Sequence, residues 1–209
     1  IRSMAEKMKK NGKNLAGLID KVYVIQKEAS KYNAYSNGKV YKLKEFIPIV
    51  RLQHIQWIKG LEDAINMETP FTGETDPRKC MMGKWLYSYE TDNPEFKKIL
   101  ERFKKYHKRL HESAVEINQE KTFEKKNRLF SRSKGNIVRL ERYFEKMTAF
   151  SDELYDRIER DRENVARQIQ DTAQRLQEDI DKLVAQVNIE MSQALKNADA
   201  VRFKGNLFL

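Results

Sequence analysis

This 209-residue sequence offers little support for disulfides, β-strands or membrane spans. It has one cysteine, Cys80, so no internal disulfide can form. No run approaches the ~20 apolar residues that a membrane-spanning helix requires, and no signal-peptide pattern begins the sequence. No segment alternates apolar and polar residues as a half-buried strand does. We therefore expect an all-α fold without strands.

Proline is also scarce, and its four positions divide the chain. All four lie between residues 48 and 94, which leaves both flanks free of the strongest helix breaker. Apolar residues recur at helical spacing in each flank, so we predict a stem helix over residues 1–40, with a turn at Asn37-Gly38. Residues 131–209 are predicted to form one very long amphipathic helix or two in series. Gly135, in "LFSRSKGNI", is the preferred break, and "TAFSDEL" is a weaker one.

Three prolines stand where a helix would begin. Pro48, Pro77 and Pro94 predict helices over residues 46–67, 77–89 and 94–118. With the flanks, these helices make an antiparallel helical bundle of the four-helix type with long flanking amphipathic helices. The expected organisation is a stem at 1–40, a central module at 41–130 and a C-terminal helical part at 131–209 that completes the bundle.

The net charge of +10 is spread among acidic residues instead of forming a basic tract. Clusters such as "KRL" and "EKK" are interleaved with acids, and residues 151–209 carry more acidic than basic residues. We interpret these charges as solvated helix faces and expect no nucleic-acid partner. The sequence also has no P-loop, nucleophile elbow or HExxH motif, so we expect no enzymatic activity.

The three histidines are the residues that indicate a binding site. His54, His107 and His111 all fall on apolar stripes of the predicted helices. His107 and His111 are spaced i and i+4, so both imidazoles lie on one helix face. Burying three unpaired imidazoles would cost on the order of 1–3 kcal/mol each, whereas a shared metal satisfies them together. Cys80 supplies a fourth ligand, and Zn²⁺ is the ion that prefers imidazole nitrogen with thiolate sulfur.

Three further residues are expected to surround this metal site. Trp57, one turn from His54, and Trp85 are interpreted as apolar cover, with core packing as the default role of both. Gly83, one turn after Cys80, would let a neighbouring helix approach closely. Four protein ligands leave no open position for a substrate water, which argues against hydrolysis by the metal.

These residues resemble a known family. His54-Ile-Gln-Trp57, Cys80-Met-Met-Gly83-Lys-Trp85 and His107-Lys-Arg-Leu-His111 are similar to the HxxW, CxxGxW and HxxxH motifs of the chemoreceptor zinc-binding (CZB) domain, over roughly residues 46–118. The resemblance implies a helical bundle that holds zinc through His54, Cys80, His107 and His111. Such domains are attached to bacterial chemoreceptors and to other signalling outputs, including diguanylate cyclases.

From the resemblance we expect a zinc-binding sensory domain of a bacterial methyl-accepting chemotaxis protein, which signals by helix rearrangement. The expected location is the periplasmic portion of an inner-membrane receptor that forms a homodimer and reaches the membrane through flanking segments outside this sequence. The alternatives are a cytoplasmic regulatory domain of another signalling protein, such as a diguanylate cyclase or a kinase, and a structural coiled-coil adaptor. Zinc would act as the signal, as a redox switch through Cys80, or as a permanent structural staple.

Overall fold

The structure is a computed structural model that describes residues 2–205 and divides into two compact units. The stem unit combines the chain up to Gln26 with the chain from Glu159 onward. The bundle unit is the continuous segment Lys27–Ile158. All four candidate metal ligands and the three sequence motifs that contain them lie in the bundle unit.

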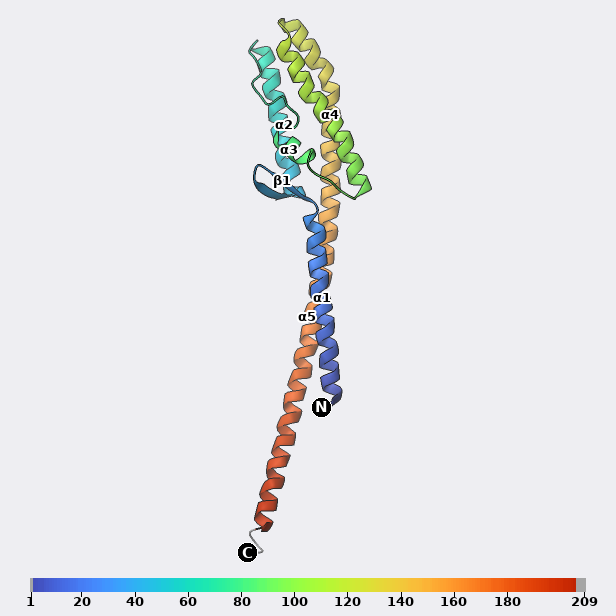
Figure 1. Ribbon diagram of the computed structural model, residues 1–209, viewed down its shortest axis with the longest axis vertical. Coiled ribbons are helices and arrows are strands. Elements are labelled where there is room, and N and C mark those ends of the chain that lie inside the picture. The colour runs from blue at the N-terminus through green and yellow to red at the C-terminus, as the bar shows by residue number, and fades with distance from the viewer. Residues whose placement is uncertain (1, 206–209) are drawn as a thin grey trace. The chain divides into compact units, whose positions relative to one another are not determined.

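Two helices build the stem unit. Helix α1 is Arg2–Ser30 and helix α5 is Phe123–Gly205, and each continues into the bundle unit. Within the stem unit the two helices run side by side (Figure 1). Leu18 and Val165 are buried there, and the Asn11 side-chain amide donates a hydrogen bond to the Asp179 carboxylate at 3.1 Å.

Helix α5 continues without interruption, so both predicted breaks, at Gly135 and in "TAFSDEL", are wrong. A Cβ built on Gly135 would meet no atom within 4 Å. One glycine costs a helix only about 1 kcal/mol. The buried side chains of Phe130, Leu140 and Phe144 on either side outweigh that cost.

The bundle unit places helix α2 (Leu43–Asn66), helix α4 (Pro94–Gln119) and the first part of α5 alongside one another (Figure 1). Their apolar stripes form the core, and the all-α helical bundle predicted from the sequence is confirmed. The largest fully buried side chains of the unit include Phe46, Leu61, Phe96, Phe103, Leu110 and Phe144.

The helix starts agree only partly with the proline positions. Helix α4 begins at Pro94 as predicted, because the Asn93 side chain caps it by accepting from the Phe96 backbone N–H at 2.9 Å. Helix α2 begins earlier, at Leu43, so Pro48 lies inside it on an exposed position. The backbone hydrogen bond lost there leaves a carbonyl that water can reach.

A short helix and a hairpin complete the bundle unit. Helix α3 is only Met81–Leu86, shorter than the predicted 77–89, because Cys80 is its N-cap residue. Strands β1 (Asn33–Ser36) and β2 (Lys39–Lys42) pair antiparallel, so the expectation of no strands is wrong. The predicted turn at Asn37-Gly38 joins them, with φ of 50° and 72°. Isolated hairpins are marginal, and this one is held by contact with α3, where the Ser36 hydroxyl donates to the Met81 carbonyl at 3.0 Å.

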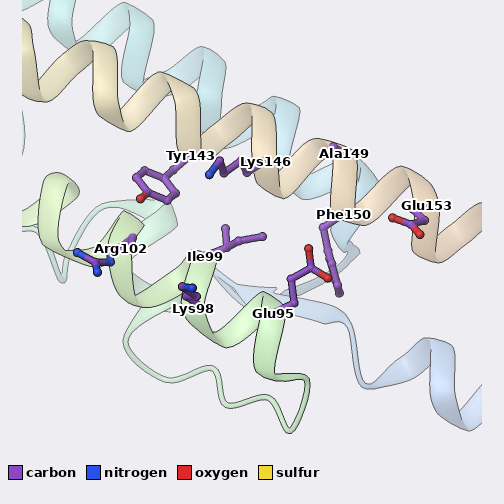
Figure 2. A pocket seen from close by; sticks show the side chains of 9 residues that line it. All are labelled: Glu95, Lys98, Ile99, Arg102, Tyr143, Lys146, Ala149, Phe150 and Glu153. Atoms are coloured by element: carbon purple, nitrogen blue, oxygen red, sulfur yellow. The ribbon is translucent and has the colours of Figure 1, made fainter.

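A groove of about 570 Å³ lies between α4 and α5 on the surface of the bundle unit (Figure 2). Its lining includes charged residues of both signs and the side chains of Ile99 and Phe150. None of the four candidate metal ligands lines it.

Candidate metal centre

The structure brings together all four residues that the sequence nominated as ligands. The ligand atoms of His54, Cys80, His107 and His111 lie within 4.8 Å of one another. His107 Nε2 is 3.1 Å from His54 Nε2 and 3.3 Å from Cys80 Sγ. The four side chains come from α2, α4 and the N-cap of α3, so one ion would connect three helices.

Each element positions its ligand for a local reason. On α4, the i, i+4 spacing places His107 and His111 one turn apart, and both are fully buried. On α2, His54 belongs to the buried face that also contains Val50 and Leu61. Cys80 is fixed by capping, because its Sγ accepts the Gly83 backbone N–H at 3.2 Å.

Backbone carbonyls fix the tautomers of two histidines. His54 Nδ1 lies 2.6 Å from the Val50 carbonyl and His111 Nδ1 lies 3.1 Å from the Glu74 carbonyl. Because a carbonyl only accepts, each Nδ1 must carry the proton and donate it. The Nε2 atoms of both rings therefore hold a lone pair, which is the arrangement typical of metal-bound histidines.

These residues fit a zinc ion. His111 Nε2 and His107 Nδ1 are buried and have no hydrogen-bond partner among the described residues, and a ligated ion would satisfy the lone pair of His111 Nε2. Zinc bonds of about 2.0–2.3 Å in a tetrahedron separate ligand atoms by about 3.3–3.8 Å, close to the contacts found between His54, Cys80 and His107. Three imidazoles with one thiol also match the ligand preference of zinc.

Burial keeps all three imidazoles neutral, as metal binding requires. It lowers the pKa of His107 to about 2, with smaller contributions from His54 and His111. Burial, followed by the charge of His54, lowers the pKa of His111 to about 4. Burial also lowers the pKa of His54 and raises the pKa of the Cys80 thiol, while the backbone N–H groups of Gly83 and Met82 oppose the latter shift.

The two tryptophans occupy different surroundings. The Trp57 ring lies 4.9 Å from the His111 ring, and its Nε1 donates to the same Glu74 carbonyl that accepts from His111, at 2.9 Å. Trp57 therefore helps to hold the carbonyl that orients His111. Trp85 is buried against Phe46 and Tyr89 in the core beside α3.

Gly83 has a close neighbour, but it is not another helix as the sequence interpretation supposed. A Cβ at Gly83 would lie 1.8 Å from the Pro77 carbonyl oxygen. The glycine thus lets α3 fold tightly against the turn immediately before it. This contact sets the position of Cys80, which lies between Pro77 and Gly83 in the sequence.

Other site residues were missed by the sequence analysis. The Glu74 carbonyl belongs to an irregular loop, so no side-chain pattern could have indicated it. The Phe103 ring stacks on His107 at 5.7 Å and the Phe144 ring lies 5.6 Å from His54. Both phenylalanines belong to the apolar stripes, which indicated burial but not contact with the histidines.

Three imidazoles and a thiol converge inside the helical bundle and form a cluster that could hold a metal ion. Residues 54–118 match the family model of the chemoreceptor zinc-binding domain, which confirms the resemblance found in the sequence. No curated protein and no solved structure matches the chain.

The family match also corrects one expectation. The chemoreceptor zinc-binding domain is of the cytoplasmic type, so the periplasmic location expected from the sequence is wrong. Among the helices described over residues 2–205, none is both long and apolar enough to cross a membrane.

Proposed function

We propose that this chain contains a zinc-binding regulatory domain of a cytoplasmic signalling protein. Its output would be a chemotaxis pathway, a diguanylate cyclase or a kinase. The observation that carries the proposal is the convergence of His54, Cys80, His107 and His111 within the segment that matches the chemoreceptor zinc-binding domain. Zinc is the ion proposed because of the ligand set.

In this proposal the metal centre has a regulatory role and no catalytic one. Bound zinc would supply a cross-link between α2, α3 and α4 and would keep the Cys80 sulfur deprotonated. Four protein ligands leave no position for a substrate, so hydrolysis is not proposed. Val50 and Glu74 orient His54 and His111 through their carbonyls, and Phe103 and Phe144 limit the access of water.

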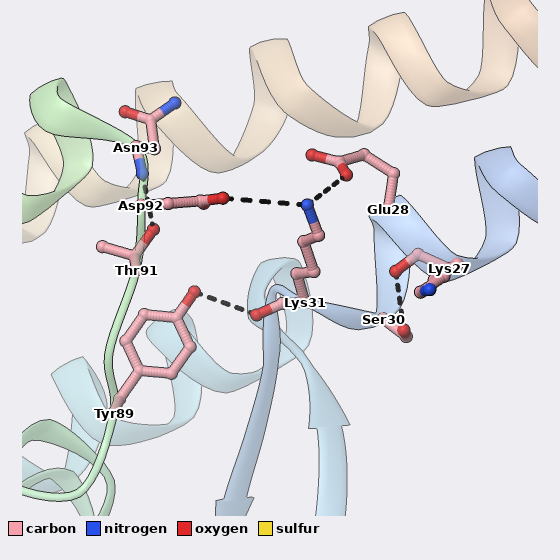
Figure 3. A network of polar contacts seen from close by, with 8 residues as sticks. All are labelled: Lys27, Glu28, Ser30, Lys31, Tyr89, Thr91, Asp92 and Asn93. Carbon is pink, nitrogen blue, oxygen red and sulfur yellow. Dashed lines mark hydrogen bonds and ion pairs between the residues drawn. The ribbon is translucent and has the colours of Figure 1, made fainter.

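Helix α3 supports a route from the metal centre to the rest of the bundle unit. It starts at Cys80, and its Lys84 ammonium donates to the Asn37 side chain in the hairpin turn at 2.7 Å. The segment after α3 contacts the end of α1, where the Tyr89 hydroxyl donates to the Lys31 carbonyl at 3.1 Å (Figure 3). The Lys31 ammonium also lies 3.8 Å from the Asp92 carboxylate. A displacement of Cys80 would therefore move contacts to both the hairpin and α1.

Elemental analysis tests the metal directly. The full chain, purified without an affinity-metal resin, is expected to contain one equivalent of zinc. Cys80→Ser is expected to lower zinc affinity, whereas Lys79→Ala, at the exposed neighbouring position, is not. A metal-free wild-type chain that binds added zinc only weakly would contradict the proposal and favour the structural adaptor.

The same variant distinguishes zinc occupancy from redox sensing. If Cys80 oxidation is the signal, oxidant is expected to release zinc from the wild-type chain and to change amide exchange in α3 and the hairpin. A Cys80→Ser chain that keeps full zinc affinity and full oxidant response would rule out the redox mechanism. If neither zinc removal nor oxidant changes exchange outside the four ligands, zinc is a structural staple.

We also propose that the chain forms a homodimer through the stem unit. Four apolar residues on α5, Val184, Val187, Met191 and Leu195, recur at helical spacing with exposed fractions between 45% and 61%. Such a stripe is typical of a helix that packs against a partner helix. Sedimentation equilibrium is expected to give a dimer that Val187→Glu dissociates and Gln193→Glu preserves. A monomeric wild-type chain would contradict dimerisation without affecting the zinc proposal.

A further inference from the structure

The groove between α4 and α5 has a size and lining that the metal centre does not explain. Its volume of about 570 Å³ lies within the range of about 300–1,000 Å³ that is usual for small-molecule sites. It is formed entirely within the bundle unit. Its residues are separate from the four candidate metal ligands.

The charges of the groove are sorted by sign. Arg102 on α4 and Lys146 on α5 lie toward one end, whereas Glu95 on α4 and Glu153 on α5 lie toward the other (Figure 2). Lys98 adds a third cation on α4. Two helical turns, about 10 Å, separate the opposite charges on each helix.

This sorting follows from the register of the two helices. The Phe96 ring on α4 stacks on Phe150 of α5 at 4.3 Å, and Tyr106 on α4 stacks on Tyr143 of α5 at 5.8 Å. The helices are therefore antiparallel at this point, and each brings its acid to the same end as the acid of the other. None of the groove's charged side chains makes an ion pair with any residue in the described part of the chain.

The charged side chains of the groove are exposed to water and have no charged partner within the described part of the chain. Glu95 and Lys98 are three residues apart on α4 but form no ion pair, and the opposite charges two turns apart on each helix are too distant to pair. Like charges from facing helices repel one another. A ligand with complementary charges would pair with both ends of the groove, because it would place an anion among the cations and a cation beside the two acids.

The middle of the groove is apolar and held in position. Ile99 and Ala149 line it together with Phe150, whose ring is fixed by the stacked Phe96. At the cationic end the Lys146 ammonium lies over the Tyr143 ring at 5.3 Å. The groove thus offers cations, an apolar surface and acids in that order along its length.

We infer that this groove binds an elongated molecule that carries a carboxylate at one end and a primary amine about 10 Å away. A peptide of three residues has this chemistry, because an extended chain spans about 3.3–3.6 Å per residue. Its carboxylate accepts hydrogen bonds from Arg102 and Lys146, and its amine donates to Glu95 and Glu153. Its central side chain packs on Phe150.

Calorimetry on the full, zinc-containing chain tests the inference with the peptide alanyl-leucyl-alanine. The free peptide is expected to bind at least about tenfold more tightly than the same peptide with either its amine acetylated or its carboxylate amidated, since a charge-assisted hydrogen bond is worth that much. An unbranched ω-amino acid of equal length is the second probe. Tighter binding of the peptide supports a peptide ligand, and equal binding supports the end charges as the only determinants.

Two variants test which end of the groove binds the carboxylate of the peptide and which end binds its amine. Arg102→Gln is expected to weaken binding of the free peptide about tenfold. It is also expected to remove the difference in affinity between the free peptide and the peptide with an amidated carboxylate. Glu153→Gln is expected to remove the difference in affinity between the free peptide and the peptide with an acetylated amine. The controls Lys97→Gln and Glu145→Gln change the same charges on the same two helices outside the groove, and they are expected to bind as the wild type does.

No binding of either probe, or equal binding of free and blocked peptides, would overturn the inference. So would controls that weaken binding as much as Arg102→Gln and Glu153→Gln. Zinc content is measured in every sample, and it is expected to be the same in all variants because no groove residue is a ligand. A failure here therefore leaves the proposed zinc function intact.

Discussion

Replacement of Gly83 by alanine is the sharpest test of how the fold positions Cys80. The new Cβ would lie 1.8 Å from the Pro77 carbonyl oxygen, 2.8 Å from the Pro77 carbonyl carbon and 3.1 Å from the Arg78 carbonyl carbon. Cβ atoms essentially never approach heavy atoms outside their own residue and its chain neighbours closer than 3.0 Å. Helix α3 and the preceding turn must therefore separate by at least about 1.2 Å.

The magnitude follows from what lies between these two segments. All three contacted atoms belong to the backbone, so no side-chain rotation relieves the clash, and overpacking of this kind costs about 1–3 kcal/mol. Cys80 stands between Pro77 and Gly83, and its Sγ accepts the Gly83 N–H. Metal sites tolerate ligand distances only within about 0.2 Å, so we expect zinc affinity to fall by about 10–100-fold.

Two measurements check this prediction: urea unfolding of the zinc-containing chain and competition for zinc against a chromophoric chelator. Gly135→Ala is the matched control, because it adds a Cβ that meets nothing within 4 Å. It is expected to stabilise α5 by about 0.5–1 kcal/mol and to leave zinc affinity unchanged. If the Gly83→Ala chain had the same stability and zinc affinity as the wild type, the reasoning would be refuted.

Three other predictions concern the metal centre and its connections. The free energy of unfolding is expected to be about 4 kcal/mol lower after chelation than in the presence of free zinc at a thousandfold excess over its Kd. An unchanged urea midpoint would contradict metal-linked stability. Trp57→Phe removes the donor to the Glu74 carbonyl and is expected to weaken zinc binding about tenfold in the chelator competition, whereas undiminished affinity would show that His111 needs no such support. Burial raises the pKa of Tyr89 to about 12, so the folded chain resists ionisation that an unfolded tyrosine undergoes near pH 10. Stability is therefore expected to fall as pH rises from 10 to 12 and to fall less in Tyr89→Phe, with urea unfolding and phenolate absorbance as the measurements.

The inward orientation of the three histidines could be predicted because it depends on local patterns. His107 and His111 share a face through their spacing alone, and His54 lies on an apolar stripe, so each had to point inward in any bundle. The start of α4 was equally local, since Asn93 and Pro94 act within one helical turn. Helical periodicity and helix capping depend only on residues within one segment, and these predictions required no information from other segments.

Errors arose where neighbours outside the segment decide the outcome. The hairpin is too short to show convincing alternation and is held by α3, which lies far along the chain. A glycine such as Gly135 destabilises an isolated helix, but the buried residues on both sides keep α5 helical through this position. Gly83 was correctly suspected of a close contact, although the partner was the turn at Pro77.

The sequence by itself determined which face of each long helix is buried and which side chains are available to hold a metal. Only the tertiary structure decided the hydrogen bond from His111 to the Glu74 carbonyl, the position of Cys80 at the start of a short helix, and the separation of charges along the α4–α5 groove. The physical reason is that helical periodicity is set by adjacent residues. Carbonyl directions in loops and the register between helices depend instead on how distant segments pack.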